Sequence, residues 1–545
     1  MNNNTIPAQV QPPPSPPPIY NNGGYYSVQS EPYNKTKIDV VFGYLGIVCS
    51  FILVNFWLFG GGPSGVATTA ALLLLLFVTV AYLIKSGVKL TVESLVFLAV
   101  LIASASYYSF FLGVVPSVIN FLFFTVMYIY FIVTATGNRL ENKIGAYTIV
   151  DLFKNIFIVA FSNFLAIFKK RDDAESKETS KGSKTLLHII LGVALAFPLL
   201  LVVIALLQNA DETFSKLTEK IMSTFFERIG LYILQLFLCL PVAIYFFALI
   251  FGNIKKRKTQ ILTKENAKNA SDACKIVPTG VIYGALSSFI LIYLLFFITQ
   301  LGYLSGGFAK ILPGEFTMAE YARRGFFELC LVAGINLLII ICVYFFTKIG
   351  DGKAPVFFKI CNTLLSFFTL FFIGVAISKM FLYIERFGLT QMRLYTSYFM
   401  IFIGIVFALV IIKQFAAKFN VMQAALIAAV AMVILFCFAD TDVQIAKYNT
   451  YRQLQNSESS GYLDYMRDLS NGAVPYIEEI YQKTDNTEIK EQALELLRGK
   501  QTYELTHIER RTWKNFNFSN ENAVRILDKY DPFSPPTDSV YEIYD

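Results

Sequence analysis

The sequence predicts an all-α, polytopic membrane protein with about eleven transmembrane helices and a small C-terminal α-helical extracytoplasmic segment. Three observations predict this fold class. Of the 545 residues, 55% are hydrophobic and only 16% are charged, whereas soluble domains have roughly 45–50% apolar and about 25% charged residues. The mean hydropathy is +0.53. Between residues 38 and 439, apolar runs follow one another, and many reach the roughly 20 residues that cross a bilayer.

The apolar runs fall into two groups. Four spans are expected within 38–135 and seven within 185–439. Their ranges are 38–60, 64–84, 90–112, 114–135, 185–207, 230–252, 278–301, 326–347, 355–378, 394–416 and 420–439.

A further apolar stretch, 147–168, is interrupted by polar residues and is flanked by basic clusters on both sides. The interrupting residues are Asp151, Lys154 and Asn155. Crossing the bilayer would put one basic cluster on the wrong side. We therefore interpret 136–184 as a cytoplasmic loop that contains an amphipathic helix lying in the membrane interface.

The distribution of Lys and Arg predicts the orientation. Loops 136–184 and 254–277 contain nine and seven of these residues, and cytoplasmic loops carry such an excess. Alternating outward from them assigns 25 Lys/Arg to inside segments and nine to outside loops. The N-terminus is thus expected inside and the C-terminus outside.

Both termini differ in composition from the membrane part. Residues 1–37 are polar and proline-rich, so we expect a disordered cytoplasmic tail. Residues 440–530 predict a helical extracytoplasmic cap, followed by a disordered tail at 531–545. Within the cap, Asp485 and Glu488 have capping-box spacing before a long helix, and Ser519 is expected to begin a last short one.

The motifs of common enzymes are absent from the sequence. It contains no P-loop, HExxH, GxSxG or dinucleotide-binding glycine motif, only two His, and no CxxC pair among seven Cys. We therefore expect no cofactor and no metal site, and an enzyme is not favoured. The membrane orientation rule explains the basic loops, so no nucleic acid is expected as a partner.

Four segments with mixed charge flank the predicted spans on the outer side. They are 209–214, 319–329, 385–395 and 439–452. Either they assemble a polar site beneath the cap, or they form interfacial ion pairs that seat the cap. The spacing of Arg324 and Glu328 places both on one helix face, so we expect Glu328 to pair with Arg324 or with Arg393.

Several of these segments also carry a resemblance. AEYARRGFFEL, GLTQMRLYT and the tail motifs IAKYNTYR, GYLDYMRDLSNGAVPYI and WKNFNFS resemble the bacterial domain-of-unknown-function families 4153 and 4173. The resemblance covers roughly residues 185–530 and implies an integral protein of the bacterial cytoplasmic membrane, without an assigned activity. The candidate outer-face polar cluster comprises Asp211, Glu320, Arg323, Arg324, Glu328, Arg393 and Asn449.

Three function classes remain open. A sensory or scaffold protein would use the cap as a platform for an extracytoplasmic protein or small-molecule ligand. A transporter or channel would use the helix bundle as a pathway for a small solute. An enzyme acting on lipids of the outer leaflet would use the carboxylates and Arg residues near that surface. The lipid bilayer is the one partner common to all three.

Overall fold

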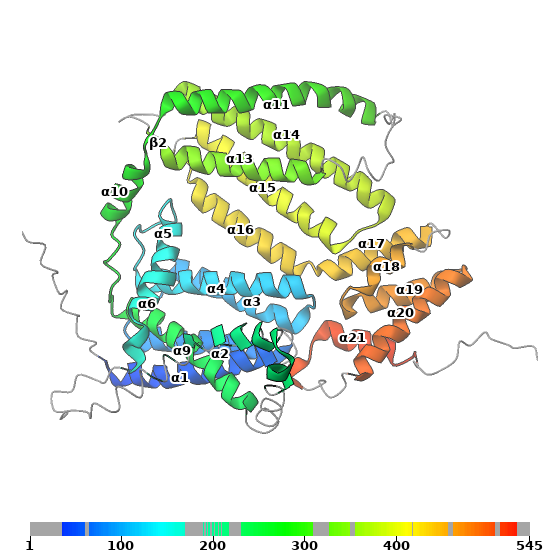
Figure 1. Ribbon diagram of the computed structural model, residues 1–545, viewed down its shortest axis with the longest axis horizontal. Helices are drawn as coiled ribbons and strands as arrows, with labels where there is room; N and C mark the ends of the chain where they lie inside the picture. The colour runs from blue at the N-terminus through cyan, green and yellow to red at the C-terminus, as the bar shows by residue number, and fades with distance from the viewer. Residues whose placement is uncertain are drawn as a thin grey trace, which may run out of the picture.

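The computed structural model describes residues 35–59, 65–168, 230–308, 326–348, 355–416, 418–455, 461–506 and 513–530, with isolated residues between 189 and 218. The described chain is almost entirely helical (Figure 1). Within it, eleven helices are long and apolar enough to cross a membrane. The predicted fold class, a polytopic all-α membrane protein, is confirmed.

These eleven helices are not the eleven that the sequence predicts. The predicted span 185–207 lies mostly outside the described residues, whereas Thr148–Phe168 is long and apolar enough to qualify by length and composition. The two sets have the same number of helices, but Thr148–Phe168 takes the place of the predicted span 185–207.

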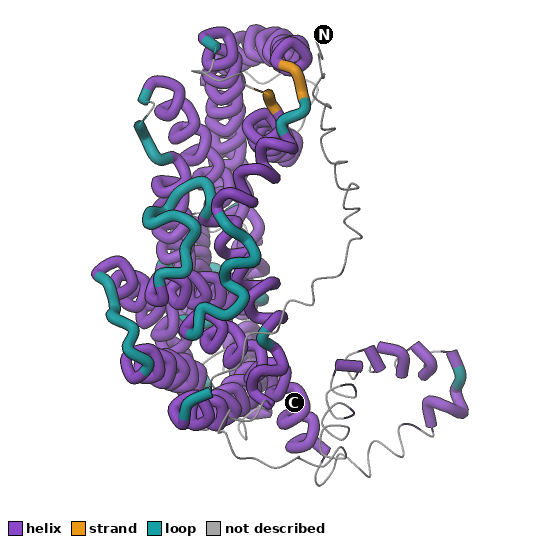
Figure 2. Tube along the Cα trace, turned by 90° about the vertical axis from the view of Figure 1, so that its left-hand side faces the viewer, coloured by secondary structure: helices purple, strands orange, loops and turns teal. Residues whose placement is uncertain are grey.

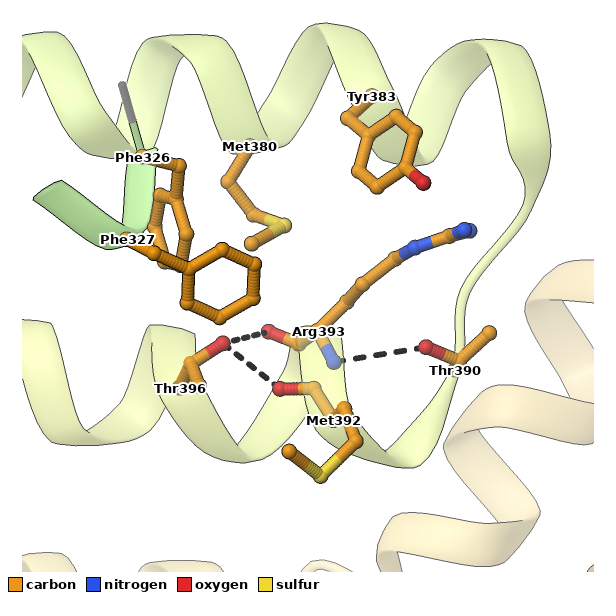
Figure 3. A pocket seen from close by; sticks show the side chains of 8 residues that line it. All are labelled: Phe326, Phe327, Met380, Tyr383, Thr390, Met392, Arg393 and Thr396. Carbon is orange, nitrogen blue, oxygen red and sulfur yellow. Dashed lines mark hydrogen bonds between the residues drawn. The ribbon is translucent and has the colours of Figure 1, made fainter. Parts of the chain in front are cut away.

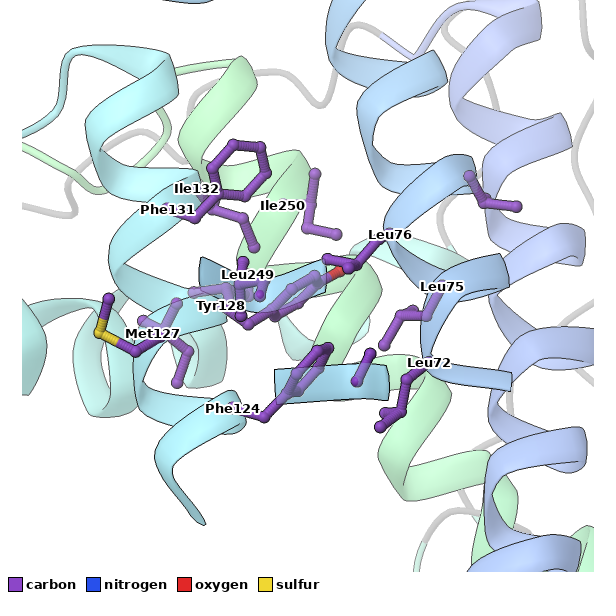
Figure 4. Close-up of a cluster of buried hydrophobic side chains, with 14 of the residues drawn as sticks. Leu72, Leu75, Leu76, Phe124, Met127, Tyr128, Phe131, Ile132, Leu249 and Ile250 are labelled. Atoms are coloured by element: carbon purple, nitrogen blue, oxygen red, sulfur yellow. The ribbon is translucent and has the colours of Figure 1, made fainter. Parts of the chain in front are cut away.

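The first bundle is built from five helices around one apolar core. They are α1 (Lys37–Val54, continued by the π-helical η1, Asn55–Phe59), α2 (Val66–Lys85), α3 (Val92–Phe110), α4 (Val114–Thr136) and α9 (Leu231–Ile254). Leu72, Tyr128 and Leu249 from three of these helices meet in the core (Figure 4). The Tyr128 hydroxyl lies 2.6 Å from Thr79 Oγ1, so the one polar atom of this ring is satisfied.

A second bundle has a core of its own. It consists of α11 (Thr279–Phe308), α13 (Phe326–Phe346), α14 (Val356–Phe387) and α15 (Gln391–Phe415). The short strands β1 (Val277–Pro278) and β2 (Thr347–Lys348) pair in parallel at one end. Helix α16 (Val421–Phe438) packs against both α15 and α4 and so joins the two bundles. Seen from the end opposite the cap, the helices of both bundles run toward the viewer (Figure 2).

The segment Thr148–Phe168 runs across the ends of α4 and α9 rather than alongside them (Figure 1). It comprises α5 (Thr148–Phe153), η2 (Lys154–Val159), α6 (Ala160–Ser162) and η3 (Phe164–Phe168). Near its start, Lys154 Nζ donates to the carbonyl of Asn138, just after α4. Near its end, the carbonyl of Ile167 accepts from Lys35 Nζ, just before α1. Both ends of the segment thus contact the same end of the first bundle. α10 (Lys264–Cys274) lies at this end as well.

The C-terminal helices form a third core at the other end of the molecule. They are α17 (Thr441–Gln455), α18 (Gly461–Arg467), η5 (Asn471–Ala473), α19 (Val474–Lys483), α20 (Thr487–Thr506), η7 (Trp513–Asn515) and α21 (Phe518–Leu527). We call residues 441–530 the cap.

Two helices of the cap begin one residue away from the predicted positions. Helix α20 is capped by Asn486, whose Oδ1 accepts from the backbone N–H groups of Glu488 and Ile489, and not by Asp485. Helix α21 is capped by Asn517, whose Oδ1 accepts from the N–H groups of Ser519 and Asn520. In both cases an Asn next in sequence to the helix offers an acceptor that the prediction overlooked.

Candidate functional site

The hairpin between α14 and α15 forms the centre of the candidate site. The sequence predicts that a span ends at residue 378. Helix α14 instead continues to Phe387. It stops at Gly388, which has a φ of +77° that side-chain-bearing residues rarely adopt. The hairpin therefore stands about two turns further from the bundle than the sequence predicts.

Side chains of the cap form hydrogen bonds with the backbone of this hairpin. Buried Asn449 donates from Nδ2 to the carbonyl of Leu389 and accepts its N–H at Oδ1, both at 2.8 Å. Arg452 donates to the carbonyl of Glu385 at 2.6 Å. Asp442 accepts from Gln391 at 2.8 Å and from the backbone N–H of Ser470 at 3.0 Å. The segments 385–395 and 439–452 thus meet, and their polar groups join the cap to the second bundle.

Arg393 lies in the first turn of α15 beside a pocket of about 210 Å³. Its Nη1 donates to the carbonyls of Phe387 and Gly388. Its guanidinium stacks over Tyr383 at 4.1 Å and faces Tyr465 at 5.4 Å. The pocket lining is drawn in Figure 3 and comprises Phe326, Phe327, Met380, Tyr383, Thr390, Met392, Arg393 and Thr396.

Glu328 follows two of the pocket residues on α13, and it interacts electrostatically with Lys379 of α14. The sequence analysis did not consider Lys379, because this residue lies 51 positions away along the chain. The expected partner Arg324 lies outside the described residues, as do Glu320 and Arg323.

Of the other predicted residues, Asp211 is exposed and caps a helical turn by accepting from the N–H of Phe214 at 2.6 Å. No contact joins it to the hairpin among the residues that the structure describes. Glu328, Arg393 and Asn449 are therefore the predicted residues whose surroundings at the hairpin are defined. Whether the whole predicted cluster acts as one site stays a prediction.

The cap is also attached to the first bundle. Asn517 Nδ2 donates to the carbonyls of Tyr108 and Phe111 at the end of α3, both at 3.0 Å. The N–H of Val66 donates to the carbonyl of Phe516 at 2.9 Å. The cap thus contacts the backbone of both bundles at the same end of the molecule.

A second polar region lies inside the second bundle. Tyr293 donates to Asn336 at 2.6 Å, and Asn336 donates to Thr369 at 2.8 Å. One and two turns before Thr369 on α14, the side chains of Ser366 and Asn362 are buried and have no hydrogen-bond partner within the described part of the chain. The sequence did not predict this region, because its side chains are neutral and stand singly among the apolar residues of the spans. The i, i+4, i+7 spacing of these polar residues could have revealed it.

Asp440 gives a pH-dependent prediction. Burial raises the pKa of its carboxyl to about 6 from 3.8, and Asp442 adds to the rise. The folded chain then binds this proton more tightly than the unfolded chain, so the free energy of unfolding falls as pH rises from about 4 to about 6. Asp440→Asn should remove this slope and raise the free energy of unfolding at pH 7 by about 1–3 kcal/mol. Thermal unfolding midpoints in detergent between pH 4 and 7 measure both effects, and an unchanged slope would contradict them.

A family model described as Domain of unknown function (DUF4153) matches residues 94–480. The chain belongs to this family. The match begins in α3 and ends in α19, so it includes the hairpin, the pocket and Asn449, and it starts earlier than the resemblance seen in the sequence. No curated protein and no solved structure matches the chain.

Proposed function

We propose that this DUF4153 protein is a scaffold or sensory protein of the bacterial cytoplasmic membrane whose helical cap is the interaction platform. The observation that carries the proposal is the attachment of the cap to both bundles. Asn449 binds the backbone of the α14–α15 hairpin, and Asn517 binds the backbone at the end of α3. A shift of one bundle relative to the other would therefore change the strain on the cap, which is the coupling that a sensor needs.

The proposal predicts that cap recognition depends on these two attachments. A photo-crosslinking residue at exposed Glu491 on α20 should form a discrete adduct with an extracytoplasmic protein in intact membranes. The adduct should be lost in the Asn449→Leu/Asn517→Leu double variant, because leucine matches the shape of asparagine but makes none of its hydrogen bonds. Asn420→Leu is the matched control, since Asn420 bonds the carbonyl of Ile144 at the opposite end.

Two outcomes would contradict the platform proposal. The same adduct in the double variant would mean that cap geometry does not control recognition. No adduct, together with solute flux through the reconstituted chain, would favour the transporter or channel alternative. The buried polar region around Asn336 and Asn362 supports that alternative, because polar side chains inside a membrane bundle frequently mark a pathway.

We further infer that the N-terminus is cytoplasmic, the cap is extracytoplasmic and Thr148–Phe168 lies in the cytoplasmic interface. The Lys/Arg distribution and the contacts of both segment ends with one end of the bundle support this. Cysteines at Lys143 and at Lys170, two residues beyond the segment, should both react with a membrane-impermeant thiol reagent from the cytoplasmic side. A cysteine at Glu491 should react only from the other side. Opposite access of the first two would make the segment a true span.

A further inference from the structure

The pocket beside Arg393 combines an apolar end with a cationic end. Phe326 and Phe327 come from the first turn of α13, and Met380 lies about two turns before the end of α14. These three side chains gather at one end of the pocket, while Arg393 extends toward Tyr383 and the hairpin at the other (Figure 3). Polarity thus increases from the bundle toward the cap, as it does from the acyl chains to the head groups of a bilayer.

The guanidinium of Arg393 still has donors available at the cationic end. Within the described part of the chain, its hydrogen bonds use only Nη1, and both acceptors are neutral backbone carbonyls. Within the described ranges, no carboxylate forms an ion pair with it. The nearby Glu328 interacts with Lys379, which offsets its charge. The half-buried guanidinium stacks over Tyr383 and faces Tyr465. Its positive charge is therefore available to bind an anion.

Two apolar side chains that line the pocket are largely exposed. Phe327 is 52% exposed and Met392 is 66% exposed, although both line the pocket and belong to helices long enough to span a membrane. Apolar side chains in this position face the lipid. An occupant can therefore enter sideways from the bilayer.

We propose that this pocket binds an anionic phospholipid from the leaflet at the cap end, with its phosphate on Arg393 and the start of an acyl chain along Phe326, Phe327 and Met380. A fork of N–H donors matches a phosphate, and the apolar end matches a chain. The pocket volume of about 210 Å³ accommodates the part of the lipid where the head group joins the acyl chain. The rest of the lipid stays in the bilayer.

Quenching of a pocket tryptophan by brominated lipids tests the proposal. The full-length Phe327→Trp variant is placed in nanodiscs of phosphatidylcholine with increasing brominated phosphatidylglycerol or brominated phosphatidylcholine. Signal from the two native Trp residues, measured in the parent chain, is subtracted. We expect half-maximal quenching at about tenfold lower mole fraction for the anionic lipid, which is the effect of about one charge-assisted contact. Leu331→Trp, one turn along α13 and 66% exposed, should be quenched equally by both lipids.

Two variants at the pocket rim distinguish an effect of charge on lipid binding from an effect on folding. Arg393 also holds the hairpin, so its removal could disturb the structure. Met392→Glu instead adds a carboxylate at the pocket rim and leaves the hairpin contacts intact, and Met392→Gln is its uncharged match. We expect Met392→Glu to abolish the tenfold preference and Met392→Gln to keep it, with equal thermal stability. Equal quenching by both lipids at Phe327→Trp, an unchanged preference in Met392→Glu, or full competition by soluble glycerol phosphate would each overturn the proposal.

Discussion

Lys154→Met is expected to lower the free energy of unfolding by about 3–5 kcal/mol, because it leaves the buried Asp151 carboxylate without its cation. Lys154 Nζ lies 3.3 Å from Asp151 Oδ1, and the two side chains are only 2% and 3% exposed. The same ammonium donates to the carbonyl of Asn138 at 2.9 Å. Methionine matches the length of the lysine chain, so the loss comes from charge and hydrogen bonding rather than from a cavity. Unfolding of the purified chain in detergent measures it.

Two further variants identify the cause of this loss. Asp151→Asn added to Lys154→Met should recover most of the stability, since it removes the orphan charge and keeps an acceptor for the N–H of Leu140, which Asp151 binds at 3.0 Å. Lys483→Met breaks a pair of similar chemistry, 2.7 Å from Glu479, whose side chains are 62% and 37% exposed. Exposed pairs contribute little, so this control should be nearly neutral. A double variant as unstable as Lys154→Met would refute the orphan-charge explanation.

The spans were largely predictable because a bilayer imposes one strong local rule. Every backbone polar group in the hydrocarbon must be paired within its own helix, so each span appears as a continuous apolar run. The end of α14 shows where the rule fails. The predicted span ends at residue 378, but the helix continues to Phe387, and Lys379 within it interacts with Glu328 of α13. A local reading could not have supplied a partner 51 residues away.

The candidate site was predictable in part for the same reason. Composition pointed to the segments 385–395 and 439–452, and the structure brings them together. Asn449, however, acts on the backbone of Leu389, 60 residues away. Such a contact leaves no periodic signal, because its acceptor and donor are main-chain atoms that every residue offers. The polar residues that interrupt 148–168 likewise form hydrogen bonds with residues outside this segment. Their partners are Asn138, Leu140 and Asn253.

Gly388→Ala is expected to lower the free energy of unfolding by about 2–4 kcal/mol and to loosen the cap. The φ of +77° alone costs a side-chain-bearing residue about 1–2 kcal/mol. In addition, a Cβ at this position would lie 2.8 Å from Tyr462 Cδ1 and 2.9 Å from Asn449 Oδ1. One of these atoms must move, and Asn449 is the residue that binds both backbone groups of Leu389. The cap should therefore be cleaved faster by added protease than in the parent chain.

Gly137→Ala is the matched control for this effect. Gly137 ends α4 with a φ of +68°, but a Cβ there would meet no atom within 4 Å. This variant isolates the backbone strain and should cost about 1 kcal/mol, with the cap as resistant to protease as before. If Gly388→Ala lowers the free energy of unfolding no more than Gly137→Ala does, Tyr462 and Asn449 can move away from the new side chain at little cost. The cap would then not be held rigidly against the hairpin, which contradicts the proposal that the cap responds to movements of the bundles.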